Sequence, residues 1–232
     1  MRPRLPGALL LAAFAVLAAP ACASAQHPDQ QPAPDQAPGS VPRMPPEGYG
    51  SLTQNDLTLR IVTPEIEVRM VPLDQRVTRL LAPDTYRSLR GLVESRRASI
   101  DSIARRSGTS RPGLALVTFY GQQAGIRFDP QTVAVTFRNQ YLQPIGIVPY
   151  SPRFNSQQLN VREQVSGIYL FQEELPVGDS FRFSYGGFNS DDWQNKQRGL
   201  DQERARVSAR ARSNGADSTG APAALARAGP RR

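Results

Sequence analysis

The chain has almost none of the side chains on which most catalytic and metal sites depend. Its 232 residues include one cysteine, Cys22, one histidine, His27, and one lysine, Lys196. A single thiol excludes a disulfide within the chain, and zinc or copper would lack their usual ligands. Serine–histidine and cysteine–histidine catalysis need an imidazole as proton acceptor, and His27 precedes the predicted folded part. The sequence therefore predicts a protein that is not an enzyme and that holds no cofactor or metal.

The first 25 residues have the features of an export signal. Arg2 and Arg4 precede an apolar run over 7–19, and Ala23-Ser24-Ala25 suits signal peptidase. The run is shorter than the roughly 20 residues that span a bilayer, so we expect its removal and no transmembrane segment in the mature chain. The predicted location is the periplasm or the extracellular space. An alternative is lipid anchoring at Cys22, although the leucine usual three positions before such a cysteine is absent.

The composition is basic, with 28 Lys and Arg against 20 Asp and Glu and a net charge of +8. Removal of the signal peptide takes away Arg2 and Arg4, and the remaining chain keeps an excess of positive charge. An exported protein rarely meets nucleic acid, so none is expected as a partner. The available partners are an envelope protein, an anionic envelope polymer or lipid.

Composition and periodicity divide the mature chain. Residues 26–50 are rich in Pro, Gln and Ala, which predicts a disordered linker. Residues 57–61 and 66–70 alternate apolar and polar side chains, as strands with one solvated face do, and Pro64 between them indicates a bend or bulge rather than a tight hairpin. The segment 114–120 is apolar on both faces, which favours a central strand or one between two layers. The predicted β-domain covers 51–190.

Other segments complete the predicted fold. Apolar residues recur every three or four positions over 84–106, which predicts one amphipathic α-helix. The stretch Leu159–Tyr185, with its Gly167–Phe171 and Phe181–Tyr185 strands and the turn that begins at Pro176, resembles the closing strands of secreted immunoglobulin-like domains of bacteria. The resemblance implies a fold and transfers no site. The predicted fold is mainly β: an antiparallel immunoglobulin-like β-sandwich with one inserted helix and a polar C-terminal helix.

The polar C-terminal helix is predicted over residues 191–212 and is basic. Residues 213–232 are predicted to form a disordered tail. Trp193, Leu200 and Val207 fall seven residues apart and form a narrow apolar seam, which could dock on the domain or on a second copy. The basic side chains could contact an anionic surface or simply be solvated. They are Lys196, Arg198, Arg204, Arg206, Arg210 and Arg212.

Aromatic and acidic side chains give further candidates. Five tyrosines, at 120, 141, 150, 169 and 185, could stack with Trp193 on sugar rings or could cover the core edge. The acidic doublets Glu173-Glu174 and Asp191-Asp192 are the candidates for paired-carboxylate hydrolysis, but adjacent strand residues point to opposite faces. Asp129 or Asp191 could contribute to a calcium site, although a turn role is the simpler interpretation.

Three functional hypotheses remain. The leading one is an exported, non-catalytic binding module that recognises a cell-envelope component or an envelope protein. The alternative is an accessory or structural subunit of an envelope assembly, docked through the C-terminal helix. A small carboxylate-based hydrolase is the third.

Overall fold

The computed structural model describes the backbone of residues 44–219 and the side chains of 44–214. The predicted signal peptide over 1–25, with Cys22, lies outside the described residues. So do His27, residues 26–43 of the predicted linker and residues 220–232 of the predicted tail. No helix in the described part of the chain is long and apolar enough to cross a membrane.

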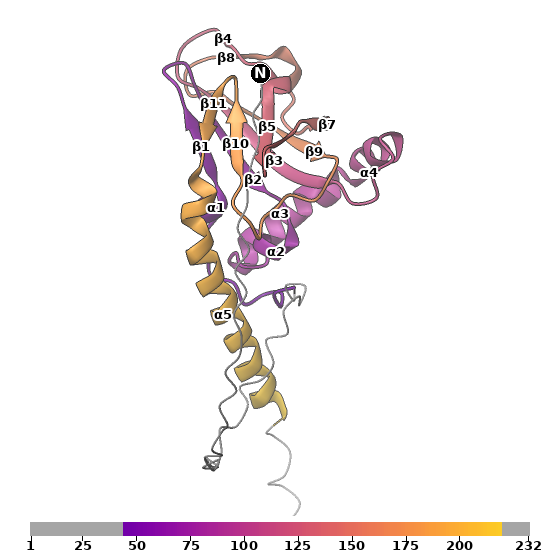
Figure 1. Cartoon of the computed structure of the whole chain (residues 1–232), viewed down its shortest axis with the longest axis vertical. Coiled ribbons are helices and arrows are strands. Elements are labelled where there is room, and N and C mark those ends of the chain that lie inside the picture. The colour runs from indigo at the N-terminus through magenta and orange to yellow at the C-terminus, as the bar shows by residue number, and fades with distance from the viewer. Residues whose placement is uncertain (1–43, 220–232) are drawn as a thin grey trace, which may run out of the picture. The chain divides into compact units, whose positions relative to one another are not determined.

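Two antiparallel sheets form most of the domain (Figure 1). One has five strands in the order β1-β2-β3-β9-β7, one has four in the order β11-β10-β5-β6, and β4 and β8 pair separately. The mainly β, antiparallel prediction with a C-terminal helix is confirmed, whereas an immunoglobulin-like sandwich is not confirmed. The strands are β1 Leu59–Val62, β2 Ile66–Pro72, β3 Gly113–Gly121, β4 Ile126–Arg127, β5 Val133–Phe137, β6 Gln140–Leu142, β7 Pro144–Pro149, β8 Gln158–Leu159, β9 Gln164–Phe171, β10 Arg182–Tyr185 and β11 Phe188–Ser190.

The two sheets meet at two corners. β6 pairs with β5 in the smaller sheet, and β7, which begins after the single residue Gln143, pairs with β9 in the larger one. The chain therefore passes between the sheets along one extended segment, and the register shifts between Pro144 and Gly146. At the other corner β1 and β11 contact each other without pairing.

An apolar core fills the space between the sheets. The ring of Phe119 on β3 stacks on Phe128 with centroids 4.5 Å apart and meets the edge of Tyr185 on β10 at 5.5 Å. Tyr169 on β9 is fully buried, and its hydroxyl donates to the carbonyl of Pro130 at 3.1 Å. Because Phe119 points into this core, the alternate residues of β3 point to the outer face of the larger sheet.

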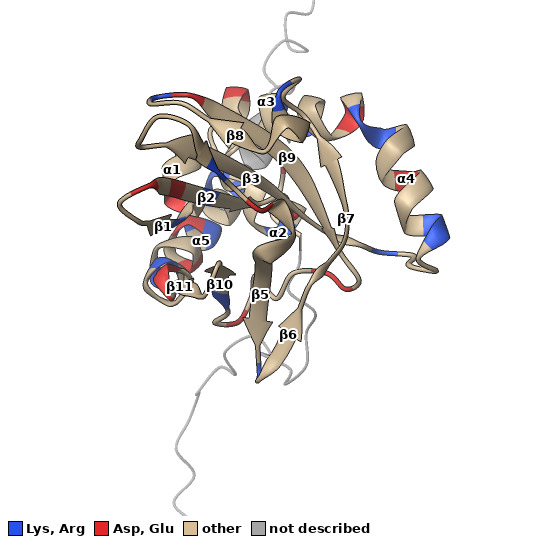
Figure 2. Ribbon diagram, turned by 90° about the horizontal axis from the view of Figure 1, so that it is seen from above, with Lys and Arg blue, Asp and Glu red and all other residues tan. Residues whose placement is uncertain are grey.

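Helices cover part of that outer face (Figure 2). Short helices α1 (Gln54–Leu57) and α2 (Gln75–Thr78) flank β1 and β2 in sequence, and α3 (Pro83–Ser95) and α4 (Arg97–Arg106) connect β2 to β3. α4 packs against β7, where a Cβ at Gly146 would lie 2.6 Å from the side chain of Ile103. The predicted central position of 114–120 is confirmed, since β3 lies between β2 and β9 with helices on its outer side.

The prediction of one continuous helix over 84–106 is wrong, because the helix is broken at Arg96. The hydroxyl of Ser95 donates to the carbonyl of Leu92 at 2.7 Å, and the backbone amide of Arg96 donates to the carbonyl of Val93 at 3.1 Å. These bonds over three residues tighten the last turn and end α3. Arg96 leaves helical geometry, with φ −115° and ψ 8°.

The prediction of a bend at Pro64 in place of a hairpin is also wrong. β1 and β2 pair along their length, and the amide of Thr63 donates to the carbonyl of Ile66 at 2.9 Å. Pro64 is the second residue of this four-residue turn, a position that needs no N–H and favours the fixed φ of proline. The turn therefore accepts the proline.

The long helix α5 (Asp192–Thr219) packs against β1 and α1 and extends past the sheets (Figure 1). Trp193, Leu200 and Val207 are at most 1% exposed, and the Trp193 ring lies 5.0 Å from that of Phe181. The predicted seam is thus buried within the chain itself, the first of the two docking modes expected for it. Residues 213–219, expected in the tail, continue this helix.

We expect the replacement Leu200→Ala to lower the free energy of unfolding by about 2–5 kcal/mol, because it leaves a cavity beneath α5. Urea denaturation followed by circular dichroism measures the change. The control is Arg198→Ala on the exposed side of the same helix, which should change stability by less than about 0.5 kcal/mol. Equal effects of the two replacements would show that α5 does not dock in solution.

Candidate binding surface

The outer face of the five-stranded sheet changes character halfway along its strands. On β3 the outward side chains are apolar at Leu116 and polar at Thr118 and Tyr120. The strand register places Val71 and Ile168 on either side of Leu116, and all three are buried at the end that the helices cover. The other end carries polar side chains, which in the described chain are half-buried or exposed, and α1 lies at its edge, where Asn55 contacts Arg60.

We call this uncovered end the open sheet face. Its side chains come from four strands and two connecting segments, and all are exposed or half-buried. They are Arg60 and Val62 on β1, Glu67 and Arg69 on β2, Thr118 and Tyr120 on β3, Gln164 and Ser166 on β9, Tyr150 after β7 and Arg96 between α3 and α4.

Two arginine–tyrosine pairs stand on the open sheet face. The guanidinium of Arg69 lies 4.3 Å from the ring centroid of Tyr120, and that of Arg96 lies 5.5 Å from the ring of Tyr150. Glu67 accepts a hydrogen bond of 2.6 Å from Arg69, and this bond raises the pKa of Arg69 against the opposing effect of burial. Each stacked cation fixes the orientation of a planar group at the surface.

The open sheet face carries more positive than negative charge. Arg69 is balanced by Glu67, whereas Arg60 forms a hydrogen bond only with the side-chain carbonyl of Asn55, at 3.4 Å. The Nε of Arg96 is buried and has no hydrogen-bond acceptor among the described residues, so a ligand could be reached only by the terminal nitrogens of this guanidinium. Neither Arg60 nor Arg96 forms an ion pair with any other residue between 44 and 214. Two cations on this face therefore have no carboxylate partner within the described chain.

Hydroxyl groups lie between these cations. Thr118 Oγ1 and Ser166 Oγ are 2.9 Å apart on neighbouring strands, and each keeps acceptor capacity for another partner. The amide of Tyr150 donates to the carbonyl of Ser166 at 2.9 Å, which places Tyr150 next to this pair. Tyr150 is 44% exposed and can stack on a flat ligand while the hydroxyls of Thr118 and Ser166 exchange hydrogen bonds with it.

The basic residues predicted on α5 do not form one patch. Arg204 pairs with Asp201, Arg206 lies 3.7 Å from Glu203, and Arg210 donates to the carbonyl of Tyr49. Lys196 is half-buried and donates to the carbonyl of Asn55 at 3.0 Å, and burial lowers its pKa.

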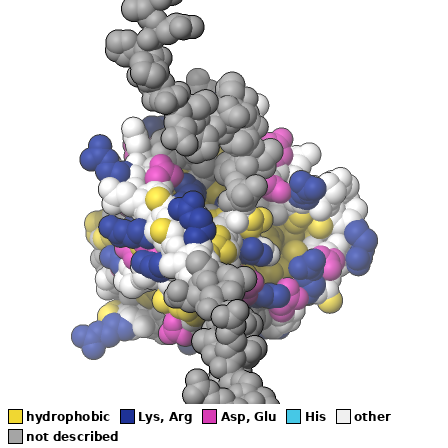
Figure 3. All heavy atoms as spheres, turned by 90° about the horizontal axis from the view of Figure 1, so that it is seen from below, with side chains coloured by type: hydrophobic (Ala, Val, Ile, Leu, Met, Phe, Trp, Pro, Cys, Tyr) yellow, Lys and Arg dark blue, Asp and Glu magenta, His cyan; other side chains and the backbone are white. Residues whose placement is uncertain are grey.

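Arg198 and Arg212 are the remaining two and are exposed, about 21 Å apart along the helix. Viewed from below in Figure 3, basic side chains are scattered among acidic ones. The structure therefore gives less support than the sequence did to a binding site for an anionic surface on α5.

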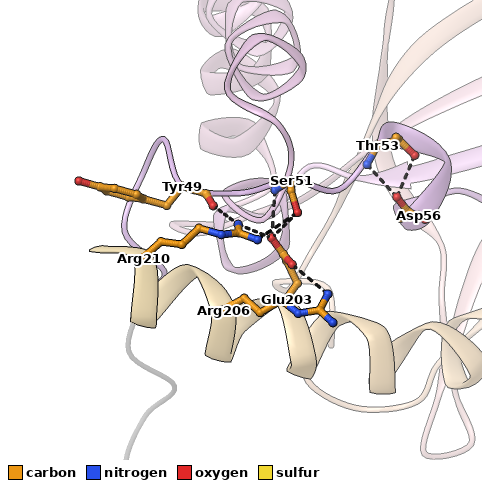
Figure 4. Close-up of polar contacts among 7 residues, drawn as sticks. All are labelled: Tyr49, Ser51, Thr53, Asp56, Glu203, Arg206 and Arg210. Atoms are coloured by element: carbon orange, nitrogen blue, oxygen red, sulfur yellow. Dashed lines mark hydrogen bonds and ion pairs between the residues drawn. The ribbon is translucent and has the colours of Figure 1, made fainter. Parts of the chain in front are cut away.

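Glu203 anchors α5 to the segment that precedes α1 (Figure 4). It is fully buried and accepts hydrogen bonds from the amide and hydroxyl of Ser51, at 3.0 and 2.8 Å, and from Arg210 at 2.9 Å. Burial raises the pKa of Glu203, but the bonds from Ser51 and the charge of Arg210 outweigh it and lower the pKa overall. Sequence reasoning missed this role, although Glu203 falls on the same helix face as Leu200 and Val207.

The other predicted tyrosines lie elsewhere. Tyr169 and Tyr185 belong to the core, and Tyr141, 57% exposed, is on β6 in the smaller sheet. Only Tyr120 and Tyr150 of the predicted set share the open sheet face. The pairing of β3 with β9, and of β9 with the segment after β7, brings them together, and this pairing is not visible in local sequence.

The structure separates the predicted acidic residues. Glu173 and Glu174 follow the end of β9, with Glu174 3.4 Å from Arg76, while Asp191 pairs with Arg182 at 2.6 Å before α5. Asp129 accepts a hydrogen bond from the amide of Gln131 and caps a short 3₁₀ turn, Pro130–Thr132. Within the described residues no three His, Cys, Asp or Glu side chains gather in a way that could hold a metal ion.

Comparison with known proteins adds no relative. A scan against protein-family models finds no match, and searches of curated proteins and of solved structures find none either.

We expect the replacement Glu203→Gln to destabilise the protein by about 1.5–3 kcal/mol at pH 7, the usual size of a hydrogen bond to a charged group. Because the pKa of Glu203 is lowered on folding, its stabilising effect is complete above the unfolded pKa of about 4.3 and is lost as the pH falls through the folded value. Thermal unfolding between pH 7 and pH 3 should therefore show the two proteins converging in acid.

The matched control is Asp201→Asn, two residues earlier on α5. Asp201 also has an arginine three residues later, but its side chain is 69% exposed, so the loss should stay below about 0.5 kcal/mol at every pH. A constant difference between wild type and Glu203→Gln across the pH range would contradict the role given to the carboxylate.

Proposed function

We propose that this protein is an exported, non-catalytic module that binds a cell-envelope component through the open sheet face. The observation that supports this best is the collection of two arginine–tyrosine pairs and two neighbouring hydroxyls on one uncovered half of a sheet. Side chains of these types recognise ligands by stacking and hydrogen bonding. Export itself is proposed from the N-terminal sequence.

The surface is well suited to binding because its backbone is fixed on both sides. β2, β3 and β9 are bonded to their neighbours along their length, and their inward side chains are buried in the core. A ligand would meet side chains already held in place, and such preorganisation lowers the entropy lost on binding. Of the predicted immunoglobulin-like fold, the proposed function needs only the two packed antiparallel sheets.

The accessory-subunit alternative is less well supported. Its docking element was the seam of Trp193, Leu200 and Val207, and these side chains are packed inside the chain. A partner of α5 would meet its exposed side, where Arg198 and Arg212 are separated by alanine and polar residues. The open sheet face has the richer set of recognition groups.

We expect the mature chain to sediment with an isolated bacterial cell-envelope fraction, and the double replacement Tyr120→Ala/Tyr150→Ala to weaken that binding about tenfold. Two aromatic contacts at about 0.5–1.5 kcal/mol each account for a change of this size. Binding isotherms from pelleting assays give the ratio. Since Tyr120 is half-buried, the single replacement Tyr150→Ala should be measured beside it.

The control is Tyr141→Ala, which removes a tyrosine from the other sheet that is 57% exposed, against 44% for Tyr150. It should leave binding unchanged, and thermal melts should show that all variants fold. The proposal fails if the wild-type chain does not sediment, or if Tyr141→Ala weakens binding as much as the loss of the two tyrosines.

A further inference from the structure

We infer that the ligand of the open sheet face is an anionic polysaccharide lying across the strands, with acidic groups meeting Arg60 at one edge and Arg96 at the other. This inference rests on the proposed function and specifies its ligand.

The strand register sets out the path of the chain. Arg60 on β1 is opposite Arg69 on β2, Arg69 is opposite Thr118 on β3, and Thr118 is opposite Ser166 on β9. The backbone amide of Tyr150 donates a hydrogen bond to the carbonyl of Ser166, so Tyr150 is the last residue of this row across the strands. The guanidinium of Arg96 lies over its ring. Four intervals of about 4.8 Å give a row of about 19 Å, which suits an extended polymer rather than a single small molecule.

Charge along the row favours an anion at both ends. Arg69, in the interior, already has Glu67 as its partner, whereas Arg60 and Arg96 have no carboxylate partner among the described residues. A guanidinium binds a carboxylate through paired N–H donors. The terminal arginines can therefore each accept an acidic group from a ligand without breaking an ion pair.

The groups between the arginines favour a sugar chain over a membrane. Thr118 and Ser166 present hydroxyls, Gln164 is exposed beside them, and Tyr150 offers a ring face to the apolar side of a pyranose. A membrane-binding surface would instead present a broad set of apolar side chains for insertion beside its cations. Here the exposed aliphatic side chains at this end of the described sheet are Val62 and, in the turn 160–163, Val161, which are too few for such a surface.

The test compares three probes with the mature full-length protein: polygalacturonate as a linear polyuronate, dextran as a neutral polysaccharide, and vesicles containing phosphatidylglycerol. Biolayer interferometry should show saturable binding to polygalacturonate that weakens as salt is added, because exposed charges are screened. Dextran and vesicles should bind at least tenfold more weakly.

The double replacement Arg60→Gln/Arg96→Gln should weaken polygalacturonate binding at least tenfold. The matched control Arg198→Gln/Arg212→Gln removes the same charge from the exposed side of α5 and should change affinity by less than twofold. Arg96→Gln alone should already show part of the loss, which keeps the test informative if the double variant folds poorly.

Four results would overturn the inference: no saturable binding of polygalacturonate, equal loss in the α5 control, equal binding of dextran, or preferential binding of vesicles. Failure of the inference can be told apart from failure of the proposed function. If polygalacturonate does not bind but the envelope fraction still does, through Tyr120 and Tyr150, only the ligand assignment falls. If neither binds, both fall.

Discussion

The outward side of β3 changes from Leu114 and Leu116 to Thr118 and Tyr120, and the use of the whole outer sheet face depends on this change. Apolar outward residues require cover, because leaving them in water costs roughly 25 cal/mol per Å². α3 and α4 provide that cover at one end. The neighbouring strands change character at the same level, from Val71 to Arg69 and from Ile168 to Ser166, so the boundary between covered and open halves is a property of the sheet.

The break at Arg96 is what lets the helices stop at this boundary. α3 and α4 cover the apolar end as two shorter pieces, and the residue between them places its guanidinium over Tyr150, at the border with the open half. At the opposite side of the domain α5 closes the corner near β1, and Glu203 fixes it to Ser51. Among residues 44–214 the side chains of the polar half therefore remain half-buried or exposed, and the core beneath them stays intact.

Short-range sequence patterns predict many of the strands and helices of this arrangement. They do not predict the contacts between residues far apart in the chain. Alternation identified β1 and β2 with the correct solvated side chains Glu67 and Arg69, and the doubly apolar 114–120 indicated a central strand. Local sequence could not show the break at Arg96, which depends on two backbone-directed bonds. It named Tyr120 and Tyr150 only among five tyrosines and did not show their shared face, because strand register links residues far apart in the chain. The carboxylate of Glu203 on the face of the apolar seam was a detectable signal, since a buried charge requires a partner.

The first described residues pack at the end of the sheet that the helices cover. Pro45 accepts a hydrogen bond from Arg79, which follows α2, and Glu47 pairs with Arg90 on α3 at 3.0 Å. These contacts hold residues 45–47 at the end of the sheet that helices cover. The open sheet face lies at the other end of the same strands, where the turns 63–65 and 160–163 are found. The hydrogen bond of Pro45 and the ion pair of Glu47 therefore lie at the opposite end of these strands from the polar side chains, and they take up none of the hydrogen-bonding groups of the open sheet face.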